Sequence, residues 1–270
     1  HPLDIEDCRS VNQRPKIDVY DDYYFLILHF PHYDRWNRFL KTKEVKIFWG
    51  EGYVITIGKP HWVVSSLFNS AKEMNDPYEI LQAGTSDALL YKILEKLMQE
   101  TLSLISKLGI ELELINRELF GKKAEKTIER ISLTRRNMIL LNTTFKPQLR
   151  LFQKFESGQI EGYAENMEEY WGNILDYYQK MWDMIEDYEE LIEGLSKTFD
   201  SMQTNRTNEI MKALTLISSI LLPLTFIASL YGMNVRLPFM NEAHTFWALM
   251  GGMLMISGGF IYLFKWKKWM

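Results

Sequence analysis

Two stretches near the end of the chain, 213–231 and 246–264, each run for 19 residues without a charged side chain. A helix of that length crosses about 30 Å of hydrocarbon, so both are predicted transmembrane helices. Pro223 lies inside the first stretch, a position that transmembrane helices tolerate. Between the two lies a predicted outer loop of 14 residues, 232–245.

Upstream of these stretches, apolar residues recur every three or four positions, which predicts amphipathic helices. The first helix is predicted to be capped at residues 85–86 and to stop at Gly121. A second covers 122–155, with Pro147 as an expected kink. A third begins near Glu165 and shows no break before Tyr231, so it is interpreted as a stalk that continues into the membrane. Residues 85–160 are therefore predicted to form a cytosolic helical hairpin. Residues 161–212 are predicted to form an acidic helix and the stalk.

Residues 1–84 carry an α/β pattern and are predicted to form a cytosolic domain. Residues 23–30 are dense in aromatic and aliphatic side chains, as in a buried strand, and 44–49 with 53–57 indicate a hairpin. About three strands are visible, and the sequence opens at His1 directly on an organised motif. We therefore expect that an N-terminal part of this domain is missing. The fold class predicted for the whole chain is an α+β cytosolic domain with long stalk helices and two transmembrane helices.

Charge and cysteine content narrow the classes of function. The formal net charge of −4 gives no indication of a nucleic-acid partner. The single cysteine, Cys8, excludes an internal disulfide and a Cys-rich zinc site. His29 and His32 form the only close histidine pair, and without helical metal-binding spacing they are interpreted as strand-edge residues.

Charges are segregated along the helices. Residues 161–193 hold eleven carboxylates and one cation, whereas 122–154 hold nine lysines and arginines against two glutamates. Two solvated helix faces that pair with each other explain this pattern. An acidic surface that gathers cations is the alternative.

Basic residues set the expected membrane topology. By the positive-inside rule, both ends of the two-span unit face the cytosol and the 232–245 loop lies outside, making a multi-pass membrane protein with cytosolic termini. The residues that carry this prediction are Arg206 and Lys212 before the first span, Arg236 as the loop's single arginine, and Lys265, Lys267 and Lys268 in the basic tail 265–270.

One face of the first span is polar. A seam at heptad spacing begins in the stalk and continues into the span, and five of its seven side chains are polar. Its residues are Asn208, Met211, Thr215, Ser218, Leu222, Thr225 and Ser229. Tight helix packing and a pore lining explain such a seam equally well. The seam leads to Asn234, which favours the pore. Two helices cannot enclose a water-filled path, so a channel requires an oligomer.

These motifs resemble a known family. Tyr-Gly-Met-Asn at 231–234, closing the first of two C-terminal spans, is similar to the signature of the CorA family of divalent-cation channels. The runs 208–212 and 223–228 resemble its pore helix, residues 1–16 its cytosolic entry motif, and the final Lys-Trp-Lys-Lys-Trp its basic tail. The resemblance spans essentially the whole chain.

The resemblance implies a pentameric funnel in the cell (inner) membrane, with the lipid bilayer, divalent cations and other copies of the chain as partners. Magnesium is the expected cargo and regulator, with cobalt or nickel as accidental cargo. The protein is then a channel and not an enzyme, and no ATP-binding loop is present. The residue roles implied are an ion-selective mouth at Gly232, Met233 and Asn234, hydration-shell contacts at Asn208, Thr215, Ser218 and Thr225, constrictions at Met211, Leu214 and Leu222, and a basic ring at Lys265, Lys267 and Lys268.

The resemblance also implies regulation by cytosolic magnesium between neighbouring subunits. Asp7, with Glu6 beside it, matches the first acidic partner, but the second falls on Asn173 instead of an aspartate. Asp176, one helical turn on, is a substitute. An amide binds a hard cation less well than a carboxylate. We therefore expect closure to need more magnesium than an Asp/Asp pair would.

The outer loop departs from the family pattern. Arg236 near the mouth opposes cation capture, and Glu242 offsets it. This difference leaves the zinc-transporting ZntB branch as an alternative, although a zinc path is expected to offer His or Cys along the seam, and the seam has none. A membrane scaffold without transport is the third reading.

Overall fold

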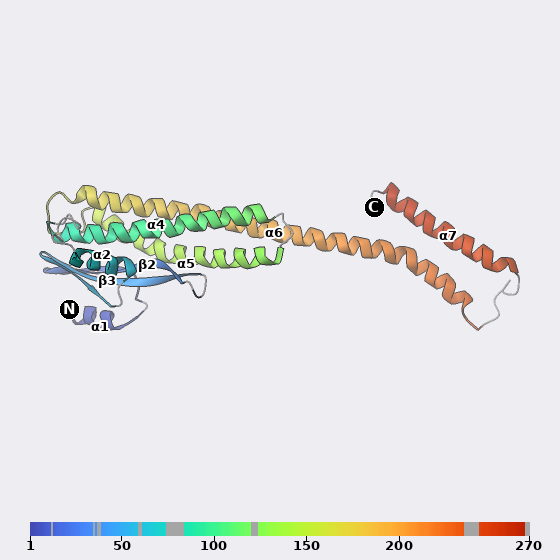
Figure 1. Ribbon diagram of the computed structural model, residues 1–270, viewed down its shortest axis with the longest axis horizontal. Helices are drawn as coiled ribbons and strands as arrows, with labels where there is room; N and C mark the ends of the chain where they lie inside the picture. Colours follow the sequence, from blue (N-terminus) through green and yellow to red (C-terminus); the bar gives the residue numbers. More distant parts are fainter. Residues whose placement is uncertain are drawn as a thin grey trace. The chain divides into compact units, whose positions relative to one another are not determined.

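The computed structural model describes residues 1–11, 13–34, 36, 39–58, 61–73, 84–119, 124–234 and 243–267. The chain divides into two units, His1–Ser196 and Lys197–Met270. The colours of Figure 1 follow the chain through both units, and each is described by itself below.

A four-stranded antiparallel sheet, in the order β1-β2-β3-β4, is the base of the first unit. Its strands are β1 (Lys16–Val19), β2 (Tyr23–Asp34), β3 (Phe39–Gly50) and β4 (Tyr53–Ile57). The predicted hairpin is confirmed, since Gly50 pairs with Tyr53 across the turn. β2 and β3 both extend beyond the predicted segments, and the four-residue β1 was not predicted.

Three long helices follow the sheet in the chain, and the sequence predicted all of them. They are α4 (Ser86–Glu118), α5 (Ala124–Glu156, with Pro147 inside) and the 64-residue α6 (Glu168–Tyr231). The side chain of Thr85 caps α4 by accepting a hydrogen bond from the Ala88 backbone N–H at 3.2 Å.

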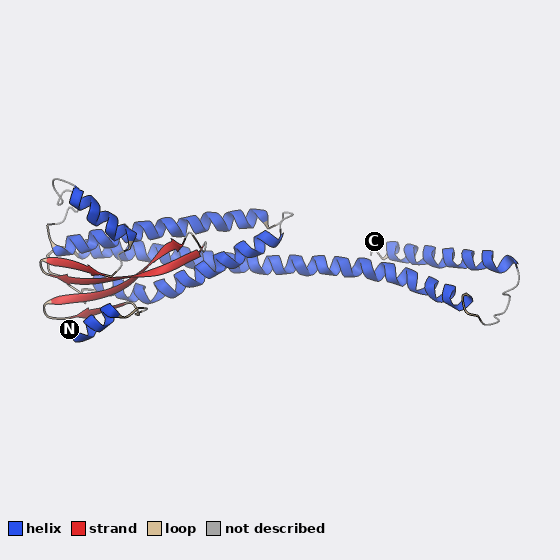
Figure 2. Cartoon of the chain, turned by 60° about the horizontal axis from the view of Figure 1, so that its bottom comes forward, coloured by secondary structure: helices blue, strands red, loops and turns tan. Residues whose placement is uncertain are grey.

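The sheet packs one face against α4 and α5, as Figure 2 shows from the sheet side. Alternate strand positions supply this core, because side chains in a strand point to opposite faces by turns. Leu26, Leu28, Ile47 and Trp49 are all 0% exposed. The Trp49 ring lies 5.8 Å from that of Trp171, which joins the start of α6 to the same core.

Two short helices were not predicted. α1 (Pro2–Arg9) contacts Tyr20 and Tyr23 of the sheet's β1–β2 side through Asp4, and α2 (Trp62–Glu73) packs on α4. The eight residues of α1 make little more than two turns, too few for a clear periodicity. Contacts with the rest of the unit, more than helix propensity, hold such a segment in place.

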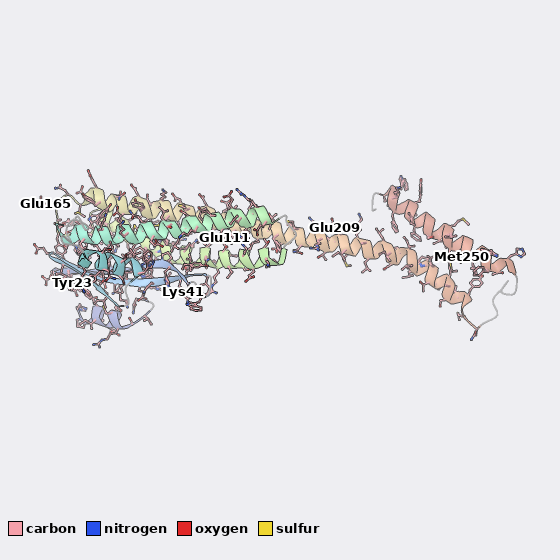
Figure 3. The ribbon with its side chains drawn as sticks, viewed as in Figure 1. Tyr23, Lys41, Glu111, Glu165, Glu209 and Met250 are labelled. Carbon is pink, nitrogen blue, oxygen red and sulfur yellow. The ribbon has the colours of Figure 1, made fainter. Side chains whose placement is uncertain are left out.

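The second unit consists of the C-terminal part of α6 and of α7 (Ala243–Trp266). Both helices are long and apolar enough to cross a membrane, and their apolar windows are 0% buried within the chain. Large side chains such as Leu254 project outward, and Figure 3 shows them as sticks along both helices. An apolar surface of this kind needs lipid or other protein chains to cover it.

Candidate functional site

The signature motif lies at the end of the long helix. α6 ends at Tyr231, and the Gly232 backbone N–H still donates to the Ala228 carbonyl at 2.9 Å. A Cβ on Gly232 would lie 3.2 Å from that same oxygen. Among the described glycines, positive φ occurs at positions 58, 158 and 162 but not at 232. Close approach to the last helical turn, and not a left-handed turn, is therefore what favours glycine here.

The other two mouth residues, Met233 and Asn234, follow the helix directly and are exposed. The Asn234 amide is accordingly accessible to solvent or an ion. The departures noted at Arg236 and Glu242 lie outside the described residues.

Every predicted pore-lining side chain is exposed within this chain. The set comprises Asn208, Met211, Leu214, Thr215, Ser218, Leu222, Thr225 and Ser229. For the large apolar members the exposed fraction is high, at 70% for Leu222. These side chains therefore do not pack against the rest of their own chain.

α7 approaches a different face of α6. The positions on α6 that are partly covered include Ile220, Leu224, Ile227 and Tyr231. Ile227 and Tyr231 share with α7 the lining of a cavity of about 390 Å³. At 3.6 residues per turn, the seam residues lie about half a turn away from this covered face. The structure thus separates the face that meets α7 from the face that carries the polar seam.

The two threonines of the seam use their hydroxyl protons within the helix. Thr215 Oγ1 donates to the Met211 carbonyl and Thr225 Oγ1 to the Leu221 carbonyl, each at 2.8 Å. A hydroxyl oxygen has two lone pairs as well as its proton. Both side chains therefore present acceptors to whatever lies along the seam.

Two of the three lysines predicted to form a basic ring are described, and both are exposed. Lys265 belongs to the last turn of α7, and the Lys267 N–H donates to the Leu263 carbonyl at 3.0 Å. Trp266 between them is 73% exposed. Lys268 lies outside the described residues. Exposed Lys and Trp at the end of an apolar helix are typical of the membrane–water interface.

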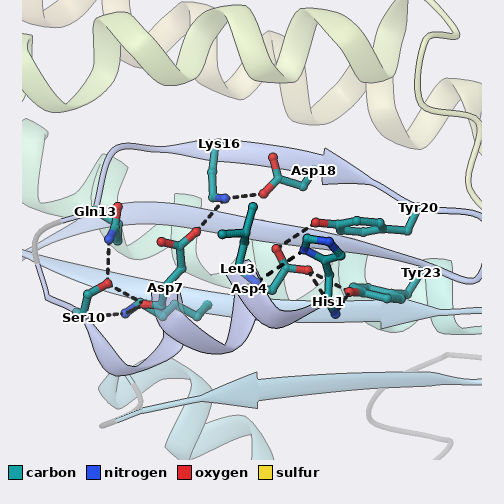
Figure 4. A network of polar contacts seen from close by, with 11 residues as sticks. His1, Leu3, Asp4, Asp7, Ser10, Gln13, Lys16, Asp18, Tyr20 and Tyr23 are labelled. Atoms are coloured by element: carbon teal, nitrogen blue, oxygen red, sulfur yellow. Dashed lines mark hydrogen bonds and ion pairs between the residues drawn. The ribbon is translucent and has the colours of Figure 1, made fainter.

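Asp7, the first of the predicted regulatory residues, already has a cation. Its Oδ2 lies 2.7 Å from Lys16 Nζ, and Lys16 also pairs with Asp18 (Figure 4). Carboxylate oxygens of Asp4, Asp7 and Asp18 lie within 4.8 Å of one another. Glu6, next along α1, is exposed.

Asn173, the second of these residues, is bound elsewhere. Its Nδ2 donates to the Tyr91 hydroxyl of α4 at 2.7 Å, while Asp176 is exposed. Burial raises the pKa of Tyr91, so that this phenol stays protonated. Asp7 thus pairs with Lys16 of β1 and Asn173 with Tyr91 of α4, so that each residue has its own partner within the chain.

The sequence did not predict the partners of Asp7 and Asn173, which are Lys16 and Tyr91. Lys16 and Asp18 alternate on one face of β1, a signal that was present but too short to identify a strand. Tyr91 stands 82 positions from Asn173, and no local pattern links them.

Known proteins resemble this chain over its whole length or nearly so. The family described as "CorA-like Mg2+ transporter protein" matches residues 1–267. The cobalt/magnesium transport protein CorA of Thermotoga maritima is 27% identical over all of this chain and 77% of its own length. A putative metal ion transporter, YfjQ of Bacillus subtilis, is 30% identical over all of this chain and 82% of its own.

The fold also matches a solved structure. The complete structure of the CorA magnesium transporter from Methanocaldococcus jannaschii superposes with a TM-score of 0.81 at 20% identity, over 100% of this chain and 87% of that one. The predicted combination of an α+β domain, a long helix and a second apolar helix is confirmed. These relatives are named as transporters and none as an enzyme. The chain belongs to the CorA-like family of Mg2+ transporter proteins.

Proposed function

We propose that the protein is a homopentameric channel of the cell (inner) membrane, with both termini in the cytosol. In this proposal it admits Mg2+, with Co2+ as a further cargo, down the membrane potential. The observation that carries the proposal is the seam, a line of exposed polar positions that runs along α6 to Asn234 on the face turned away from α7.

A repeated α6 makes a path out of this seam. One copy exposes four polar seam residues, Thr215, Ser218, Thr225 and Ser229, within the uncharged stretch 213–231, and lipid does not solvate such groups. Copies of α6 arranged around an axis would turn every seam toward a shared water-filled lumen, with α7 on the outside. This arrangement gives each polar group water and each apolar face lipid or protein.

The chemistry of the mouth suits a hydrated ion. Mg2+ loses its waters reluctantly and usually keeps several. A ring of neutral Asn234 carbonyl oxygens accepts hydrogen bonds from those waters without the strong trapping that carboxylates would cause. Thr215 and Thr225 offer acceptor oxygens further along, since their protons are already donated to the helix. Met211, Leu214 and Leu222 would form the narrow apolar steps.

The membrane potential supplies the driving force. A divalent cation gains about 4.6 kcal/mol per 100 mV of inside-negative potential, twice the value for one charge. The exposed Lys265 and Lys267, with Lys268 beyond them, would lie at the cytosolic interface.

Regulation by cytosolic Mg2+ at Glu6, Asp7, Asn173 and Asp176 is expected to be weak. Lys16 neutralises Asp7, and Asn173 contributes an amide that already donates to Tyr91. Asn173→Asp restores a carboxylate and is expected to lower the Mg2+ concentration that protects the cytosolic unit from proteolysis. Asn205→Asp, an exposed change elsewhere on α6, is the control. An unchanged protection curve for Asn173→Asp would remove this position from the regulatory site.

Ion flux into liposomes that contain the full chain tests the transport proposal. We expect Mg2+ entry that follows an inside-negative potential and ignores a pH gradient. Asn234→Ala should abolish this flux, whereas Asn205→Ala, off the seam on the same helix, should leave it intact. Zn2+ flux that follows protons would favour the zinc alternative. Unchanged Mg2+ flux in Asn234→Ala would show that the mouth lies elsewhere.

A further inference from the structure

A large cavity lies in the first unit beside the sheet. Its volume is about 1030 Å³, and it is lined by α4, α5, the facing ends of β2 and β3, and the first residue of α2. Pockets that bind small molecules usually measure about 300–1,000 Å³. The cavity is therefore large enough for an organic ligand and far larger than a single water molecule needs.

Two buried side chains of α5 bring polar groups to this cavity. Thr134 and Asn137 are 3% and 4% exposed, and both line it. Asn137 Oδ1 accepts a hydrogen bond from the Leu40 N–H of β3 at 2.9 Å. Among the described residues, nothing pairs with Asn137 Nδ2 or with Thr134 Oγ1. Polar groups that are this deeply buried nearly always have a partner, so these two require one from within the cavity.

His32 of β2 adds a third polar group to the lining. Its Nδ1 is buried and has no hydrogen-bond partner in the part of the chain that the structure describes. Burial and the charge of nearby Lys43 lower the pKa of His32, so the ring is neutral near pH 7. A neutral imidazole has one donor and one acceptor nitrogen. The sheet end of the cavity, defined by His32, Leu40 and Asn137, therefore presents uncharged donors and acceptors.

Apolar surfaces adjoin these polar groups. Leu104 and Leu108 of α4 form an apolar wall, and the Trp62 side chain, 55% exposed, also lines the cavity. An accessible indole offers a stacking surface to an aromatic ring. Donors, acceptors and a stacking surface together suit the flat, hydrogen-bonding ring of a nucleobase.

The cavity also has charged walls. α4 and α5 run in opposite directions (Figure 1), and Arg130 of α5 pairs with Glu111 of α4, which is labelled in Figure 3, at 2.7 Å. Lys107 and Lys126 lie one helical turn from these two residues, line the cavity and have no ion pair among the described residues. They outnumber Glu129, the lining carboxylate nearby that also lacks an ion pair. Free ammonium groups of this kind bind phosphate oxygens.

We propose that this cavity binds a nucleotide, with the base at the sheet end against Trp62 and the phosphates at Lys107 and Lys126. Glu100 lines the cavity about 16 Å from Glu111 along α4, and its carboxylate accepts a hydrogen bond from an amino group of the base. Thr134 lies between the two ends and serves the sugar hydroxyls. The inference concerns the first unit alone and does not rest on the proposed transport function.

Equilibrium dialysis of ATP and GTP against the full chain in detergent tests the proposal. Divalent cations are left out, so that no ion bound elsewhere carries the nucleotide. We expect one saturable site per chain for at least one of the two nucleotides. The matching nucleoside, which lacks phosphates, should bind about tenfold more weakly. Tripolyphosphate, which lacks the base, should bind about tenfold more weakly as well.

Variants at exposed positions locate the site without disturbing the core. Trp62→Ala should weaken nucleotide binding about tenfold through lost stacking, and Lys126→Gln should weaken it through the lost phosphate contact. Trp36→Ala is the control for the first, because Trp36 is 96% exposed and does not line the cavity. Lys154→Gln, an exposed change in the last turn of the same helix as Lys126, is the control for the second.

Two results would overturn the proposal. One is the absence of saturable binding of either nucleotide, or binding that both Trp62→Ala and Lys126→Gln leave unchanged. The other is tripolyphosphate binding as tight as that of the nucleotide, which would leave no role for the base at the sheet end.

Discussion

The two units of this protein place the same kinds of side chain in opposite surroundings. In the first unit, Trp49 is 0% exposed between the sheet and the helices. In the second, Leu254 is 68% exposed on α7. The first unit buries its apolar surface against its own chain, whereas the second presents it outward. Lipid or other protein chains are needed to cover the second unit.

Polar groups show the same contrast. The carboxylate of Asp7 and the amide of Asn173 both find partners inside the first unit. The seam residues of α6 face outward, and the threonine protons there turn back to the helix. Paired groups such as these two stabilise the first unit, whereas a line of unshared acceptors within an apolar segment is suited to contact with a passing hydrated ion.

The largest expected stability effect tests the contrast in apolar burial. Trp49→Ala should lower the free energy of unfolding by about 3–5 kcal/mol, because it leaves a cavity in a packed core. Leu254→Ala should change it by less than about 0.5 kcal/mol, because the side chain is exposed. Denaturant titration of the detergent-solubilised protein measures both. An equal decrease in the free energy of unfolding for both variants would mean that Leu254 is buried, which would contradict the contrast between the two units.

The next largest effect is the pH dependence of stability, which compares two histidines. Burial lowers the pKa of His61 to about 4, whereas exposed His244 belongs to the second unit. A histidine with a lowered folded pKa binds protons more readily when unfolded, so stability is full above pH 6.5 and falls as the pH drops toward 4. The loss should reach about 3 kcal/mol, and His61→Gln should flatten this pH slope. His244→Gln is the control, and a slope that His61→Gln leaves unaltered would contradict the assignment.

The smallest effect compares two glycines in the second unit. Gly232→Ala places a Cβ 3.2 Å from the Ala228 carbonyl, whereas one on Gly259 would meet nothing within 4 Å. We expect Gly232→Ala to cost about 1 kcal/mol through crowding at the end of α6. Gly259→Ala should cost nothing in a single chain, because the added Cβ meets no atom and alanine favours a helix interior more than glycine does. If Gly259→Ala alone reduces the apparent size of the detergent-solubilised protein in size-exclusion chromatography, Gly259 has a role in the proposed assembly.

The sequence predicted the elements whose signals are local and long. The hairpin at residues 50–52, the cap at Thr85 and the unbroken course of α6 follow from alternation, capping chemistry and helical spacing. It missed β1 and α1, since four and eight residues carry too little periodicity. Tyr20, Tyr23 and Lys46 hold α1 in place, and these contacts exist only after the sheet has formed.

By itself, the sequence determined the two apolar spans, the polar seam and the Tyr-Gly-Met-Asn motif, because composition and spacing along one helix carry that information. The tertiary structure decided which cation accompanies Asp7, which group binds Asn173, and that α7 meets α6 on the face opposite the seam. Each of these depends on residues that are separated in sequence and meet only in the folded chain. The seam from Asn208 to Asn234 could therefore be predicted from the sequence, because its residues lie close together in the chain. The pairing of Lys16 with Asp7 could not.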